Sequence, residues 1–153
     1  MAPRQDIPAL EAHLGYWLRQ ISNHVSMGFA RKLAAQDVTV AEWALMRVLY
    51  DEERLSPSRV ATRMGLTRGA VTKLADRLIP KGMILRQASP DDGRAQTLGL
   101  TATGRNFVPD LAALADKNDA ECFSHLPPHD RHALKTILQG LARHLGITGV
   151  ATD

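Results

Sequence analysis

The chain has 153 residues, of which 44% are hydrophobic and 23% charged, and its formal net charge is +3. This length supports one domain with its own core, and the composition excludes a disordered chain or a small disulfide-stapled scaffold. The single cysteine, Cys122, excludes an intrachain disulfide and any zinc site built from several cysteines. No apolar stretch approaches the ~18 residues of a membrane span and no secretory signal follows Met1, so we expect a cytoplasmic protein without membrane contact.

The charge is unevenly distributed along the chain. Between Arg54 and Arg105 there are 10 Lys and Arg residues against 3 acidic ones, a local charge of +7, whereas the remainder has 9 basic and 13 acidic residues, or −4. A basic middle third between acidic ends is expected when one part of a protein meets a polyanion. Random surface charge is the alternative interpretation.

The N-terminal third predicts two helices. Apolar residues recur every three or four positions from Ile7 to Ala35, which indicates a long amphipathic helix. Such a helix exceeds the usual globular length, so part of its apolar face is expected to contact another chain or a second long helix. Thr39 and Glu42 have the spacing of a capping box and predict a second helix over about 40–51.

Two shorter helices are expected next. Ser56-Pro57 is a typical helix start, and Gly65 suits the left-handed residue after a helix, so we expect a helix over 57–64. Thr67 caps a further helix that runs to about Ile79. Two short helices joined by a glycine-containing turn form the helix-turn-helix pattern, although structural helix pairs share this spacing.

The outer face of the 67–79 helix has the chemistry for reading DNA. Arg and Lys donate to guanine edges, Thr contacts bases or thymine methyls, and Gly allows close approach to a phosphate. The predicted contact residues are Thr67, Arg68, Gly69, Thr72, Lys73 and Arg77.

A β-hairpin is predicted after this helix. Residues 83–87 and 97–101 are strand-like, and a charged, turn-rich segment separates them. A hairpin in this position is a wing, and Arg94 at its tip is the candidate for entering the minor groove. We expect Asp92, with Gly93 between them, to orient the Arg94 guanidinium by a bidentate pair. The alternative is a solvated surface turn.

The remaining chain predicts two helices and a free end. A helix after Thr101 is expected to reach Leu126 with a kink at Pro109, and an amphipathic helix follows Pro127-Pro128 and runs to Gly146. Residues 147–153 are expected to be frayed.

Several motifs together resemble the multiple antibiotic resistance regulator (MarR) family of winged helix-turn-helix transcription factors. They are Leu66-Thr67, Lys81-Gly82-Met83-Ile84, Asp92-Gly93-Arg94, Leu98-Gly99-Leu100-Thr101 and Gly104. The resemblance covers nearly the whole chain. It implies a mainly α-helical fold with a small β-hairpin wing, in which residues 37–104 form the DNA-binding lobe and residues 1–36 and 105–146 the dimerisation helices.

The resemblance also implies partners. They are double-stranded DNA with a pseudo-palindromic operator, a second copy of the chain, and a small molecule, such as an aromatic acid, that releases a repressor from its operator. The candidate dimer residues are Leu10, Leu14, Leu134, Leu138 and Leu141. The candidate effector-pocket residues are Trp17, His24, Trp43 and Met46, which equally fit a hydrophobic core.

Other function classes have weaker support in the sequence. The alternatives are a metal-responsive regulator that uses His125, His129 and His132, and a redox-responsive one that uses Cys122. The acidic residues beside Cys122 disfavour a reactive thiolate. The sequence lacks the hydrolase, metalloprotease and phosphate-loop motifs, so we expect no enzyme, no catalytic residues, no metal and no cofactor. A winged-helix protein-interaction module remains the third class.

Overall fold

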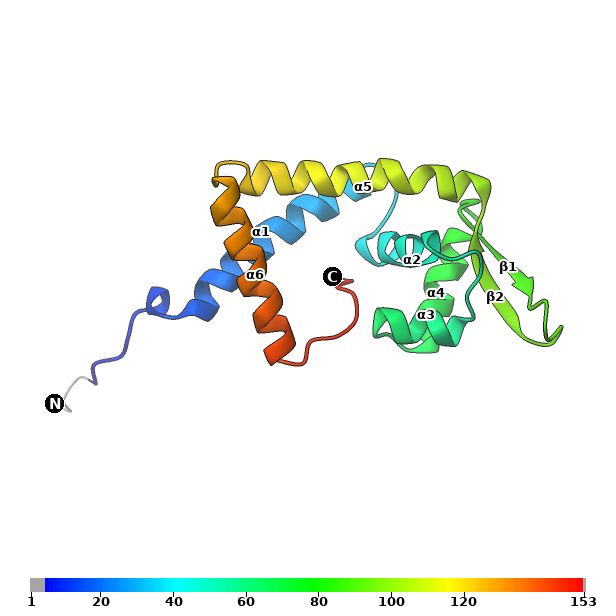
Figure 1. Cartoon of the computed structure of the whole chain (residues 1–153), viewed down its shortest axis with the longest axis horizontal. Helices are drawn as coiled ribbons and strands as arrows, with labels where there is room; N and C mark the ends of the chain where they lie inside the picture. The colour runs from blue at the N-terminus through cyan, green and yellow to red at the C-terminus, as the bar shows by residue number, and fades with distance from the viewer. Residues whose placement is uncertain (1–4, 153) are drawn as a thin grey trace.

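The structure is a computed structural model that describes residues 5–152, and it consists of helices with one small β-hairpin (Figure 1). Residues 1–4 and 153, which belong to the predicted dimerisation helices and tail, lie outside the described residues. The elements in chain order are the 3-10 helix η1 (Leu10–Ala12), α1 (Leu14–Ala34), α2 (Val40–Tyr50), α3 (Pro57–Met64), α4 (Arg68–Leu78), β1 (Ile84–Ala88), β2 (Gln96–Leu100), α5 (Ala102–Phe123) and α6 (Pro128–His144). The mainly helical fold with a hairpin wing is therefore confirmed.

The helices of the central lobe begin and end where local sequence signals predict. Thr39 and Glu42 form both bonds of a capping box at the start of α2, and the Ser56 hydroxyl accepts from the Arg59 N–H at the start of α3. Gly65 ends α3 in the left-handed conformation, with φ of 67°. Thr67 caps α4 by accepting from the Ala70 N–H. These caps satisfy backbone donors that the first helical turn leaves unpaired.

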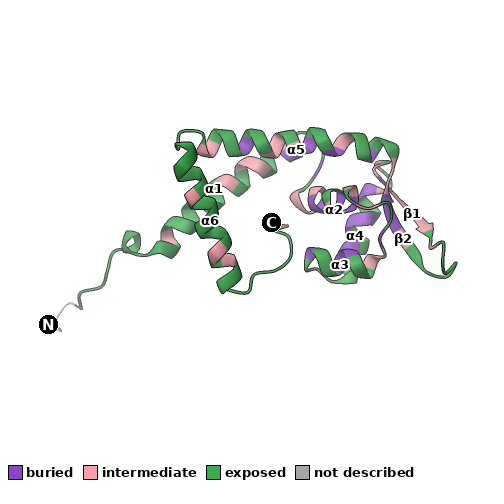
Figure 2. Cartoon of the chain, viewed as in Figure 1, coloured by how far each residue is buried: buried purple, intermediate pink, exposed green. Residues whose placement is uncertain are grey.

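One hydrophobic core joins α2, α3, α4 and the hairpin (Figure 2). Its fully buried side chains include Leu45, Met46, Leu49, Val60, Val71, Leu78 and Ile84. The two strands pair antiparallel with Ile84 opposite Leu100, and an isolated bridge connects Leu55 to Leu98. Each strand begins and ends within one residue of its predicted position. The core thus holds α3, α4 and the hairpin in one lobe.

The N-terminal helix is shorter than predicted. Periodicity places its start at Ile7, but α1 begins at Leu14 because His13 is extended, with φ −101° and ψ 132°. Pro8 disfavours helical backbone at Ile7. The indole N–H of Trp17 donates to the Glu11 carbonyl at 2.9 Å, so this side chain partners a backbone oxygen at the break.

The α5 helix connects the lobe to the far end of the molecule. It continues through Pro109 as one helix and ends at Phe123 rather than Leu126 (Figure 1). Its N-terminus is joined to the hairpin because the Thr101 hydroxyl donates to the Gly82 carbonyl at 2.6 Å. A methyl group at Gly104 would lie 2.1 Å from the Met83 carbonyl oxygen, so this crossing requires glycine.

The segment after α6 differs from the prediction of a frayed end. It returns toward the lobe, where the Val150 N–H donates to the Met64 carbonyl at 3.2 Å. Its contact is with the turn that joins α3 to α4, a long-range neighbour that periodicity cannot reveal. Among the helices in residues 5–152, none combines the length and hydropathy of a membrane-spanning segment.

Candidate DNA interface and ligand pocket

The outward face of α4 carries every predicted recognition residue. Thr67, Arg68, Gly69, Thr72, Lys73 and Arg77 are all exposed. Two of the hydroxyls already serve the helix itself: Thr67 is its cap, and Thr72 donates to the Arg68 carbonyl at 3.0 Å. The Thr72 methyl and its oxygen lone pairs stay accessible. The face therefore presents three long cationic side chains together with the small residues Gly69 and Thr72.

Most cations of the basic segment fall into two groups in the structure. One group is used internally: Arg63 pairs with Glu52, Lys81 with Glu42, and Arg86 with Asp76. The other group forms no ion pair within residues 5–152, and its members are Arg54, Arg59, Arg68, Lys73, Arg77 and Arg94. The second group holds the charge available to a polyanion, because a paired cation must first give up its partner.

Arg86 is not among the predicted DNA-contact residues. Its guanidinium donates to the Asp76 carboxylate at 2.9 Å and so links β1 to the outer face of α4. The same contact compensates the one acidic side chain on that face. Alternation along the strand marks Arg86 as exposed, but no local signal identifies its partner ten residues earlier.

The wing tip is exposed, but Asp92 has a different role from the one predicted. Its Oδ1 accepts from the backbone N–H of Arg94 at 3.0 Å, forming a turn within the loop. The predicted bidentate pair with the guanidinium is therefore wrong, because an Asp side chain two residues before an N–H is ideally placed to bond the backbone. The Arg94 guanidinium has no hydrogen-bond or ion partner within residues 5–152 and extends from the tip that contains Gly93.

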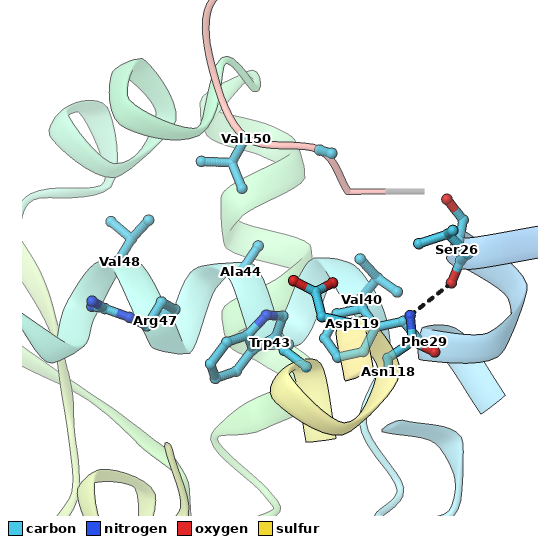
Figure 3. A pocket seen from close by; sticks show the side chains of 13 residues that line it. Ser26, Phe29, Val40, Trp43, Ala44, Arg47, Val48, Asn118, Asp119 and Val150 are labelled. Atoms are coloured by element: carbon cyan, nitrogen blue, oxygen red, sulfur yellow. Dashed lines mark hydrogen bonds between the residues drawn. The ribbon is translucent and has the colours of Figure 1, made fainter. Parts of the chain in front are cut away.

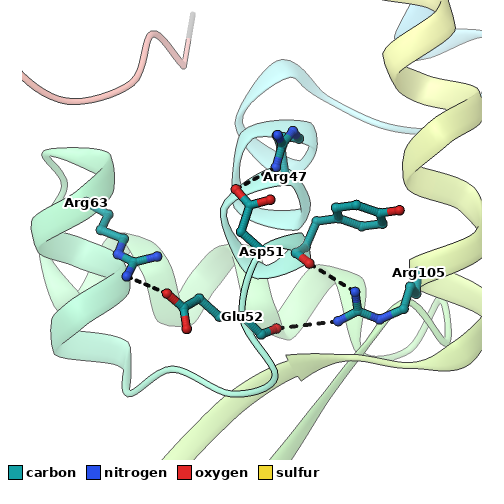
Figure 4. A network of polar contacts seen from close by, with 6 residues as sticks. Arg47, Asp51, Glu52, Arg63 and Arg105 are labelled. Carbon is teal, nitrogen blue, oxygen red and sulfur yellow. Dashed lines mark hydrogen bonds and ion pairs between the residues drawn. The ribbon is translucent and has the colours of Figure 1, made fainter.

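A polar network fixes the lobe to α5 (Figure 4). Arg105 donates to the Tyr50 carbonyl at 2.9 Å and to the Glu52 carbonyl at 3.4 Å, and its guanidinium lies 5.2 Å from the centre of the Tyr50 ring. Glu52 in turn pairs with Arg63 on α3 at 2.7 Å. Arg105 therefore serves the fold, although the charge count alone assigns it to the basic surface.

A pocket of about 350 Å³ lies between α1, α2, α5 and the segment after α6 (Figure 3). Its apolar walls include Phe29, Trp43, Val48 and Val150, and its polar groups include Arg47, Asn118 and Asp119. In Figure 3, Arg47 and Asp119 lie on opposite sides of Trp43. The size is at the lower end of the range typical for small-molecule sites.

The predicted pocket set needs correction. Trp43 lines the pocket, but Met46 is fully buried in the core, and neither Trp17 nor His24 on α1 is part of the lining. Helical spacing indicates that these side chains share apolar faces, but it does not reveal which faces meet. Val150 and Asn118 could not be predicted for the same reason, since they come from distant parts of the chain.

Asn118 links the pocket to the packing of α1 on α5. It is buried, its Nδ2 donates to the Val25 carbonyl at 3.0 Å, and its Oδ1 accepts from Lys32 at 3.1 Å. Lys32 also pairs with Glu121 at 2.6 Å, and this hydrogen bond holds the pKa of the Glu121 carboxyl below its ordinary value of 4.5. Both polar atoms of the buried amide are thus satisfied.

Comparison with known proteins gives a consistent result. The MarR family model matches residues 38–95. An HTH-type transcriptional repressor of Mycobacterium tuberculosis is 26% identical over 131 residues, which cover 86% of this chain and 94% of the relative. The chain belongs to the MarR family. It is a MarR-family transcriptional regulator.

Two solved structures share the fold of this MarR-family chain. CouR from Rhodococcus jostii bound to p-coumaroyl-CoA has a TM-score of 0.74 at 23% identity, covering 89% of this chain and 96% of CouR. A mutant of Escherichia coli MarR complexed with operator DNA has a TM-score of 0.73 at 21% identity, covering 84% of this chain and 92% of the mutant.

The terminal helices of this MarR-family chain expose their apolar faces. Leu14 is 83% exposed and Leu138 43%, and no residue of α6 is buried. The remaining predicted dimer residues, Leu10, Leu134 and Leu141, are exposed as well. Exposed apolar stripes on two helices are typical of a surface that another protein covers.

The alternative sensing residues of this MarR-family chain are not gathered into a site. Cys122 is a half-buried free thiol. Within residues 5–152 no group of three or more His, Cys, Asp or Glu side chains is arranged to hold a metal ion, His125, His129 and His132 included.

Proposed function

We propose that the protein is a homodimeric repressor that binds a pseudo-palindromic operator with α4 in the major groove and the wing in the minor groove. The observation that carries this proposal is the outer face of α4, where Arg68, Lys73 and Arg77 project without an ion partner within residues 5–152. Arg94 supplies a fourth unpaired cation at the wing tip. These are the groups that contact phosphates and guanine edges in winged helix-turn-helix proteins.

The dimer follows from the apolar faces at the two ends of the chain. Leu10 begins the short helix η1 and Leu14 begins α1. The other three leucines lie on α6, outside the buried core; they are Leu134, Leu138 and Leu141. Covering them with the same segments of a second copy gives an isologous interface. It also sets two recognition helices at a fixed spacing, as two half-sites one DNA turn apart require.

The pocket suits a small aromatic acid that releases the operator. Trp43 and Phe29 provide aromatic surface, while Arg47 provides a cation at the rim, although Asp51 already pairs with it at 2.9 Å. Support comes from the p-coumaroyl-CoA that the structurally similar CouR binds. A ligand there releases DNA only if it binds the DNA-incompetent arrangement more tightly, by about 1.4 kcal/mol for each tenfold loss of affinity.

The test is operator binding with DNA from the region beside the protein's own gene. Fluorescence anisotropy should show a specific affinity whose logarithm falls steeply with the logarithm of salt concentration, by about 0.9 per phosphate contact. A slope near zero, or no preference for any site, contradicts the DNA-binding proposal.

The effector is tested with benzoate and 4-hydroxybenzoate beside zinc, a chelator and a hydroperoxide. A Trp17→Phe variant leaves Trp43 as the single tryptophan, so quenching of its fluorescence reports binding in the pocket. We expect release by an aromatic acid. Release by zinc or hydroperoxide alone would shift the sensing role to the histidines or to Cys122.

A further inference from the structure

The segment after α6 contacts the helix-turn-helix through its backbone. Ile147 donates to the Ala142 carbonyl at 2.9 Å and ends α6, and three residues later Val150 donates to Met64. Met64 is the last residue of α3, directly before the turn into α4. Figure 1 shows this segment passing from the end of α6 into the space beside α2 and α3.

Two glycines make this contact possible. Gly149 has φ of 89° and Gly65 φ of 67°, and a methyl group at Gly149 would lie 3.0 Å from the Met64 carbonyl oxygen and 3.2 Å from the Gly65 Cα. Gly65 is required in any case as the residue that ends α3. Gly149 lies in no helix or strand, so both its positive φ and its missing side chain suit the contact with the turn.

The same segment forms one wall of the pocket. Val150 and Ala151 line it together with Ala44 on α2 and Ala115 on α5. In Figure 3 the Val150 side chain extends toward α2, on the side of the pocket away from Asn118. One short stretch of chain therefore contacts the pocket with its side chains and the helix-turn-helix with its backbone.

We propose that residues 148–151 form a strap that couples occupancy of the pocket to the position of the helix-turn-helix. A ligand in the pocket gains contact with Val150 only while the strap is docked, so ligand binding and docking stabilise each other. A docked strap also ties the turn at Gly65 to the end of α6. This link restrains the lobe from moving to the position that binding two half-sites requires. The docked state is therefore the weaker DNA binder. The ligand half of the proposal rests on the proposed function; the docking half does not.

The chain offers a matched pair of variants. Gly149→Ala places a methyl group against Met64 and Gly65, whereas Gly146→Ala places one in open space at a residue with a similarly positive φ of 66°. Both variants carry a backbone penalty for a positive φ. Only the first is expected to undock the strap.

Three measurements on the full chain test the proposal. In the parent and in Gly146→Ala the Val150 amide should be protected from hydrogen exchange, and Gly149→Ala should lose this protection. Without ligand, Gly149→Ala should bind the operator about twofold to tenfold more tightly, because one hydrogen bond shifts an equilibrium by roughly this factor. The concentration of benzoate or 4-hydroxybenzoate needed for half release should rise by the same factor.

Free exchange of Val150 in the parent overturns the strap, as does equal operator affinity of the Gly149→Ala and Gly146→Ala variants. If neither acid quenches Trp43 or releases the parent, the effector proposal fails in its stated form. The exchange and operator measurements still decide whether the strap docks and restrains the lobe, because neither needs a ligand.

Discussion

Asp76 of α4 accepts a 2.9 Å hydrogen bond from Arg86 of β1, so the recognition helix and the wing share one ion pair on the surface proposed to face DNA. Removing one side chain of this ion pair is expected to affect DNA binding differently from removing the other. Asp76→Ala leaves a free cation toward DNA, whereas Arg86→Ala leaves a free carboxylate there. We expect operator affinity to be retained or raised by the first and to fall about tenfold with the second. Both should leave the thermal transition nearly unchanged, since exposed ion pairs contribute about 0–1 kcal/mol. Anisotropy titrations of the two variants at one salt concentration check this; equal effects would contradict it.

Arg94→Ala should weaken operator binding by roughly 1–3 kcal/mol per subunit. The thermal transition should stay the same, because the Arg94 side chain has no partner within residues 5–152. Arg131→Ala on α6 is the control, since it removes the same charge from an exposed position away from the wing. If both variants bind like the parent, the wing is a spacer and not a minor-groove contact.

Replacing Leu138 and Leu141 with Glu should abolish dimerisation, and folding and operator binding should be lost together. The reason is that both side chains lie on the exposed apolar face of α6, which the proposed partner covers. Sedimentation velocity across a dilution series measures the association. Gln139→Glu, on an exposed position of the same helix, tests whether added negative charge alone causes the loss. A folded monomer in the parent at low concentration would refute the dimer.

Glu121 gives the protein a pH-dependent contribution to stability. Because Lys32 lowers the pKa of its carboxyl in the folded state, the stabilisation is present above the ordinary pKa of 4.5 and is lost as the pH falls through the lower folded value. Glu121→Gln should therefore be less stable than the parent near pH 7, and the difference should vanish as the pH falls through the lowered pKa of the folded state. Denaturant unfolding at a series of pH values measures it. A difference that stays constant with pH would exclude this origin.

Gly104→Ala should destabilise the fold by about 2–4 kcal/mol, because the new methyl group would meet the Met83 carbonyl where α5 leaves the hairpin. Gly93→Ala is the matched control, since a methyl group there meets nothing within 4 Å. Thermal melts of both variants suffice. Similar melting temperatures would mean that the crossing of Met83 over α5 can open at little cost.

Local signals in the sequence predicted the lobe well, and long-range contacts account for what it missed. Thr39, Ser56 and Gly65 act on their own helix ends, so their roles can be read within four residues. The pocket is formed by side chains from α1, α2, α5 and the segment around Val150, and their meeting depends on packing. The misplaced start of α1 has a local cause instead, because Pro8 disfavours helical backbone at Ile7 and Trp17 bonds the Glu11 carbonyl only six residues away.

Charge patterning identified a basic segment but not which of its cations are free of partners within residues 5–152. Arg63, Arg86 and Arg105 contribute to the local +7, yet each contacts a partner within the fold. An ion pair between residues 10 or more positions apart has no periodic signature. The prediction that Asp92 pairs with the Arg94 guanidinium failed for the opposite reason. The two residues are so close in sequence that the Arg94 backbone N–H, not the guanidinium, is the nearer donor to Asp92.

The attachment of α5 at both ends has a mechanical consequence. Its first turn is fixed to the hairpin by Thr101 and to the lobe by Arg105, and its second half is fixed to α1 by Asn118. A helix of 22 residues is about 33 Å long. A tilt of about 5° at the α1 end therefore moves the hairpin end by roughly 3 Å. The helix acts as a lever, so a small change in packing near Asn118 displaces the hairpin by a distance comparable to the rise of one DNA base pair.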